Sequence, residues 1–127
     1  MINDFQISNH FNLKEFECND ETQAVKVMPE LVERLETLRE LVSDHLGSDT
    51  ALIINSGYRT PTYNRKIGGA KKSQHMEGTA ADVSLPDGMS ADNMAALAEQ
   101  AGFDGIGKYN TFVHVDVRGY NARWDNR

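Results

Sequence analysis

The chain has 127 residues, a length typical of one domain with one hydrophobic core. Hydrophobic residues make up 39% and charged residues 25%, which is the composition of a folded protein and excludes wholesale disorder. The 13 Lys and Arg against 19 Asp and Glu leave a net charge of -6, which argues against a protein that coats DNA or RNA.

Cysteine content and hydropathy exclude further classes. The single cysteine, Cys18, excludes an intramolecular disulfide framework and a zinc site made of several thiolates. No apolar run approaches the length of a membrane span, and the opening residues MINDFQISNH lack the basic start and apolar stretch of a signal peptide. We therefore expect one domain over residues 1–127, a monomer that is synthesised in the cytoplasm without a signal peptide.

Capping residues mark the first two predicted helices. Asn12 and Glu15 form a capping-box pattern, which predicts a short helix over 12–16. Pro29 and Gly47 bracket a longer helix, because apolar residues between them repeat at helical spacing. We interpret this longer helix as part of the core.

The rest of the chain predicts shorter elements. They are a strand over 51–55, a helix from Thr60 to about Lys66, a mobile loop over 67–74, a strand over 79–85, a helix from Ser90 to Gly102, and strands over 105–109 and 111–117. Helices followed by mixed strands predict an α+β fold.

Two of the four histidines have an aspartate close by in the sequence. His75 precedes Asp82 by seven residues, and Gly78 between them would let the chain bend so that the two side chains converge. On its own this pattern is common by chance. In the strand FVHVD, alternation places His114 and Asp116 on the face opposite the core valines, where a solvent-exposed His–Asp pair is the alternative to a functional site.

Together, His75, Asp82 and His114 form a set of two histidines and one aspartate. Three protein ligands leave the fourth tetrahedral position of Zn²⁺ open, as in catalytic zinc sites. Bound zinc lowers the pKa of a water molecule to ~7 and polarises a carbonyl group. A nearby carboxylate can then act as the general base, and Asp116 is the first candidate because it shares a strand face with His114.

Arg59 lies between a predicted strand and a predicted helix. At this position its guanidinium group could hold a substrate carboxylate or stabilise an oxyanion, whereas a surface ion pair is the alternative. Arg59 begins a basic cluster, which we expect to face an anionic substrate rather than nucleic acid; its other members are Arg65, Lys66, Lys71 and Lys72.

Three blocks of the sequence resemble, in order, the zinc D-Ala-D-Ala carboxypeptidase family, which also contains D-Ala-D-Ala dipeptidases and phage cell-wall endopeptidases. The blocks are SGYRTPTYN from Ser56, SQHMEGTAAD from Ser73 and GIGKYNTFVHVD from Gly105. The segment HFNLKEFEC from His10 also resembles the opening of short, often phage-encoded members. The resemblance implies a small α+β domain in which two or three helices pack on an antiparallel sheet that carries the metal.

By resemblance, His75, Asp82 and His114 are the zinc ligands. Arg59 would stabilise the polarised carbonyl or bind the terminal carboxylate of the peptide, and Ser73 would contact the substrate.

The sequence departs from the family pattern at one position. Several branches of the family place an acidic base three residues before the last zinc histidine, where this chain has Thr111. The base would then be Asp116 or Glu77, and Asp116 could instead orient a ligand histidine.

These features predict a zinc peptidase that hydrolyses peptidoglycan stem peptides at D-amino-acid bonds. It would be a D-Ala-D-Ala carboxypeptidase or a cell-wall endopeptidase, and an endolysin-like enzyme of this kind would reach the wall after release from the cell. The alternative is a non-catalytic, zinc-stabilised module of the same fold that binds the cell wall or a protein, because Thr111 replaces an acid.

Overall fold

The computed structural model describes residues 2–127, which form three α-helices, two short 3-10 helices and a five-stranded sheet. The strand order is β1-β2-β4-β3-β5, and neighbouring strands are antiparallel except for β3 and β5, which are parallel. The α+β fold is therefore confirmed. The elements are η1 (Leu13–Phe16), α1 (Pro29–Leu46), β1 (Ile54–Ser56), α2 (Pro61–Lys66), η2 (Gln74–Glu77), β2 (Ala80–Ser84), α3 (Ala91–Ala101), β3 (Gly105–Lys108), β4 (Phe112–Asp116) and β5 (Ala122–Asp125).

The predicted caps begin and end the helices. Gly47 follows α1 with a left-handed φ of 74°, a conformation that glycine adopts without steric cost. The side chains of Thr60 and Ser90 accept backbone N–H bonds at the starts of α2 and α3. The capping box of Asn12 and Glu15 is present, although the turn that it begins is a 3-10 helix. Within residues 2–127, none of the helices has the length and apolar character needed to cross a membrane.

The strands differ from the prediction at the two edges of the sheet. β1 begins at Ile54, where its register with β2 starts, and the preceding Ile53 is 64% exposed rather than buried as predicted. The predicted loop over 67–74 ends in the 3-10 helix η2. The sequence did not predict β5, whose residues Ala122–Asp125 lack an apolar pattern because an edge strand buries little of its surface.

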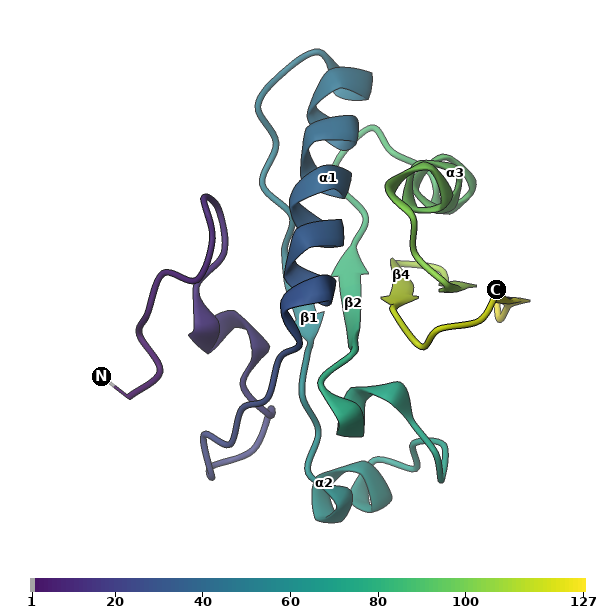
Figure 1. Cartoon of the computed structure of the whole chain (residues 1–127). Coiled ribbons are helices and arrows are strands. Elements are labelled where there is room, and N and C mark those ends of the chain that lie inside the picture. The colour runs from purple at the N-terminus through teal and green to yellow at the C-terminus, as the bar shows by residue number, and fades with distance from the viewer. Residues whose placement is uncertain (1) are drawn as a thin grey trace.

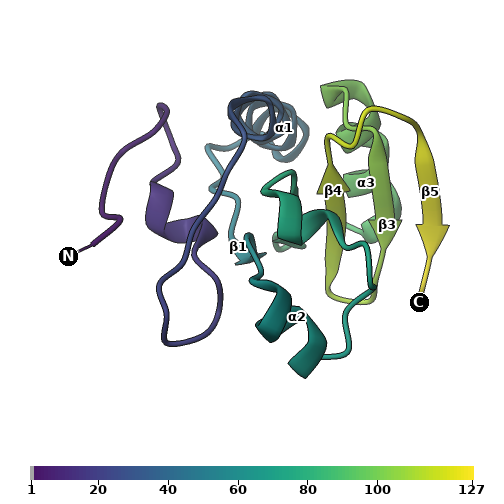
Figure 2. The ribbon, with the colours of Figure 1, turned by 60° about the horizontal axis from the view of Figure 1, so that its bottom comes forward.

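Two helices cover one face of the sheet. α1 and α3 lie side by side against it, whereas α2 and η2 lie at one end of the strands (Figures 1 and 2). The core between the helices and the sheet includes Val83 of β2 together with Val113 and Val115 of β4, all fully buried. Because side chains alternate along a strand, Asp82 and His114 lie on the opposite face of the sheet.

Hydrogen bonds to Glu36 and beside β1 help attach the N-terminal segment to the body. Glu36 of α1 accepts hydrogen bonds from the Ser8 hydroxyl and the His10 backbone and pairs with the His10 ring at 2.6 Å. Burial raises the pKa of Glu36, but these bonds outweigh burial and hold the pKa below its usual value. Near the sheet, Tyr58 donates a backbone bond of 2.8 Å to Phe16, which anchors η1 beside β1.

Candidate metal centre

One row of residues crosses the polar face of the sheet. Asp82 of β2 lies directly opposite His114 of β4, and Ser56 of β1 lies opposite Asp82. On the other side of His114, the row continues through Gly107 of β3 to Trp124 of β5. The strand register therefore places two of the predicted ligands side by side without a contribution from loops.

The third predicted ligand, His75, lies on η2 beside this row. Ser73 caps η2, because its hydroxyl accepts a bond of 3.2 Å from the His75 backbone. The Nδ1 of His75 donates to the Gly57 carbonyl at 2.7 Å, which fixes the orientation of the ring and directs Nε2 toward Asp82. This Nε2 lies 3.2 Å from Oδ1 of Asp82. Gly57 therefore orients a ligand although it has no side chain.

His114 is held from its opposite ring nitrogen. Its Nε2 donates to Oδ2 of Asp116 at 2.7 Å, and its Nδ1 lies 3.1 Å from Oδ1 of Asp82. The ligand atoms of His75, Asp82 and His114 all lie within 4.8 Å of one another, and all three residues are buried.

The spacing of these atoms fits a zinc ion. With metal–ligand distances of about 2.0–2.1 Å, two ligands of a tetrahedral ion lie about 3.3 Å apart. The two histidine nitrogens lie 3.2 and 3.1 Å from the same Asp82 oxygen. The other nitrogen of each ring is already bonded to Gly57 or Asp116, as is usual for histidines that bind a metal.

The electrostatics of the site also favour a cation. Burial raises the pKa of Asp82, but hydrogen bonds from His114 and His75 outweigh burial and hold that pKa well below its usual range. Burial lowers the pKa of His114, whereas Asp116 and Asp82 raise it above its usual value. The two carboxylates therefore favour positive charge at this place, which a metal cation would supply.

Arg59 lies beside the metal ligands, as the sequence predicts. Its Nη2 is 3.4 Å from Oδ2 of Asp82, and its Nε donates to the Ser56 hydroxyl at 3.2 Å. Asn64, which the sequence analysis did not single out, accepts from Nη1 of Arg59 and donates to the Ala70 carbonyl. Asn64 is only 3% exposed, so a buried amide joins Arg59 to the loop before η2.

The position of Asp116 fits the orienting role better than the role of general base. It is fully buried, and both of its oxygens accept hydrogen bonds from Arg118 in addition to the bond from His114. Burial raises the pKa of Asp116, but His114 and Arg118 outweigh burial and hold it well below the usual range. A general base works best when its pKa is near the working pH. Arg118 was not predicted, because its sequence position does not reveal this pair.

The three proposed metal ligands lie in a cleft of about 500 Å³. Its lining includes Arg59, Lys72 and Ser73, together with three aromatic residues that the sequence analysis did not single out: Tyr109, Phe112 and Trp124. Asp82 is the one carboxylate among the residues that line this cleft within the described chain. Of the two predicted bases, Asp116 lies behind His114, and the exposed Glu77 lines a separate cavity beside α2.

Comparisons with known proteins agree with this geometry. Residues 9–116 match the family model described as Peptidase M15, and this range contains all three proposed ligands. A stretch of 57 residues is 39% identical to the zinc D-Ala-D-Ala carboxypeptidase of Streptomyces albus G. This stretch covers 45% of the chain and 21% of that relative, so the similarity spans about a fifth of the relative's length. The family resemblance seen in the sequence blocks is confirmed, and the chain belongs to the Peptidase M15 family.

Proposed function

We propose that the chain is a zinc peptidase that hydrolyses peptidoglycan stem peptides at bonds next to D-amino acids. The observation that carries this proposal is the convergence of two histidine nitrogens on one Asp82 oxygen inside a cleft. The family match and the name of the Streptomyces albus G relative support the choice of a peptide substrate with D-alanine.

His75, Asp82 and His114 would hold the zinc ion, which supplies an activated water molecule and polarises the scissile carbonyl. Arg59 would bind the terminal carboxylate of the peptide or stabilise the developing negative charge on the carbonyl oxygen. Asp116 would keep His114 in the tautomer whose Nδ1 faces the metal. Ser73, which lines the cleft at the start of η2, would contact the substrate.

The second candidate function is a zinc-stabilised module that binds the cell wall or a protein without hydrolysis. The observation that favours it is the lining of the cleft, in which Asp82 is the one carboxylate among the described residues. With Asp82 committed to the metal, neither Asp116 nor Glu77 reaches the cleft as a base.

Digestion of purified peptidoglycan separates the two candidates. The protein is loaded with one equivalent of zinc, incubated with peptidoglycan, and the released muropeptides are identified by mass spectrometry. A peptidase releases fragments whose masses identify the cleaved bond, and His75→Ala abolishes the release. A protein that retains one zinc ion and binds the wall, but releases no fragment, has the second function.

We infer further that the protein acts on the wall from outside, after release from the cell, as endolysins do. The basic residues Arg65, Lys66 and Lys71 are exposed on α2 and on the loop that follows it, which supports contact with an anionic wall. Added externally, the protein should clear suspensions of permeabilised bacteria, and the rate of clearing should fall as salt concentration rises. Clearing only after expression inside the cell would contradict this inference.

A further inference from the structure

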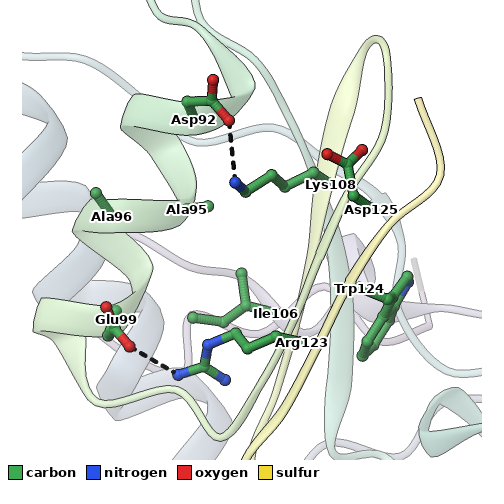
Figure 3. A pocket seen from close by; sticks show the side chains of 9 residues that line it. All are labelled: Asp92, Ala95, Ala96, Glu99, Ile106, Lys108, Arg123, Trp124 and Asp125. Atoms are coloured by element: carbon green, nitrogen blue, oxygen red, sulfur yellow. Dashed lines mark hydrogen bonds and ion pairs between the residues drawn. The ribbon is translucent and has the colours of Figure 1, made fainter.

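Trp124 is the one tryptophan of the chain and lies beyond the residues that match the family model, which end at Asp116. It belongs to β5, which pairs in parallel with β3. β5 is also fixed to α3, because Arg123 pairs with Glu99 at 3.3 Å. Figure 3 shows Arg123 directed toward α3 and Trp124 on the other side of the strand, away from α3.

A glycine gives the Trp124 ring its position. Trp124 and His114 are separated by one strand, and the residue between them in the row is Gly107. A Cβ atom at Gly107 would overlap the indole ring, so the ring lies directly across the backbone of β3. The ring centroids of Trp124 and His114 are therefore only 5.0 Å apart.

Polar and aromatic contacts hold the ring in this orientation. The indole Nε1 donates a hydrogen bond of 3.0 Å to the Tyr109 hydroxyl. Tyr109 in turn stacks on Phe112, with ring centroids 4.4 Å apart and planes inclined by 9°. The guanidinium group of Arg118 lies 5.4 Å from the Trp124 ring. The cleft therefore contains an aromatic cluster beside the proposed metal ligands, made of Trp124, Tyr109 and Phe112.

The two ends of the row differ in chemistry. Arg59 follows β1, at one edge of the sheet, so this side of the cleft offers a cation. Trp124 belongs to β5, at the other edge, and its ring offers apolar surface beside the guanidinium group of Arg118, whose charge is paired with Asp116. A ligand that spans the metal would meet the Arg59 cation on one side, and on the other side the aromatic carbon of Trp124 beside an Arg118 whose charge is already paired.

We propose that Trp124 is a specificity-determining residue that packs against an apolar side chain of the substrate next to the scissile bond. The proposal rests on the proposed function, because it takes the metal centre as the place of cleavage. The preferred substrate is then a peptide with an anionic group on the Arg59 side of the metal and a methyl or larger side chain on the Trp124 side.

Two synthetic stem peptides test the proposal, one ending in D-Ala-D-Ala and one ending in Gly-Gly. Dissociation constants are measured by calorimetry on the zinc-loaded protein, and kcat and KM are measured separately. The preference is the ratio of the dissociation constants of the Gly-Gly peptide and the D-Ala-D-Ala peptide. We expect Trp124→Ala to reduce this ratio by about fourfold, which corresponds to the free energy of burying one methyl group. Trp124→Phe should restore most of the preference, and Phe5→Ala, which removes an exposed and distant aromatic ring, should leave it unchanged.

Gly107→Ala provides a second variant if Trp124→Ala does not fold. The added methyl group displaces the indole without deleting it, so the same selective loss is expected. An unchanged preference in both Trp124→Ala and Gly107→Ala overturns the proposal, even if the peptides are hydrolysed. A changed preference in binding without hydrolysis of either peptide supports the role of Trp124 and refutes the peptidase function. Absence of binding to the wild-type protein overturns both.

Discussion

Replacing Asp116 by asparagine distinguishes an orienting residue from a general base. Asp116 is fully buried and accepts bonds of 2.7 Å from both His114 and Arg118. Asparagine has the same shape, but it removes the charge and replaces one acceptor oxygen by an amide that donates. One of the N–H groups that now point at Asp116 would therefore lose its acceptor.

The size of the effect follows from these contacts. Loss of the partner of a ligand histidine lowers metal affinity about 10- to 100-fold, or about 1.4 to 2.7 kcal/mol. Arg118 would also lose the negative charge that pairs with it, which lowers the free energy of unfolding of the metal-free protein by up to about 3 kcal/mol. This is the low end for a broken buried pair, because the Arg118 side chain is 17% exposed. Competition with a chromophoric chelator measures the first quantity, and unfolding in denaturant with a metal chelator present measures the second.

The exposed Asp49, which pairs with Arg39 at 2.8 Å, offers a matched control. Asp49→Asn should change stability and metal affinity by no more than about 0.5 kcal/mol. If Asp116→Asn binds zinc as tightly as the wild type and loses hydrolysis alone, Asp116 is the base and the orienting role is refuted.

Three further changes test other parts of the molecule. His75→Ala should reduce the zinc stoichiometry, measured by elemental analysis, from one toward zero. The control His45→Ala, at an exposed site at the end of α1, should retain one zinc. Full zinc binding by His75→Ala would contradict the ligand set. Gly69→Ala would overlap the side chain of Asn64, so it should displace Arg59 and raise KM in steady-state kinetics while zinc stoichiometry is unchanged. The pKa of Glu36 is held below its usual 4.5, so its contribution to stability is present above that pH and is lost as the pH falls through the lowered value. Glu36→Gln should therefore unfold at lower denaturant concentration at pH 7, and its difference from the wild type should shrink in acid; a constant difference at all pH values would refute this.

Local patterns predicted the helices and the two central ligand positions. Caps such as Ser90 act within a few residues, and the alternation of FVHVD alone placed His114 opposite the core. Contacts between distant segments could not be predicted in this way. The strand β5 has little apolar surface, so its pairing with β3 depends on tertiary contacts, and with it the position of Trp124.

The same limit explains why the sequence alone left two roles open for Asp116. The sequence shows that it shares a strand face with His114, but not that Arg118 occupies both of its oxygens. Nor does it show that Asn64, rather than an acidic residue, holds part of the Arg59 guanidinium group.

The placement of the three ligands on η2, β2 and β4 has a consequence for the order of folding. His114 is distant in the sequence from His75, and the two approach only when β4 has paired with β2, with the core valines packed behind them. Contacts of this range form late, because loop closure must precede them. Zinc should therefore enter a nearly complete sheet, and metal binding should slow unfolding far more than it speeds folding. Bound zinc would then lower the rate at which an already formed sheet unfolds, so its main effect would be on kinetic stability.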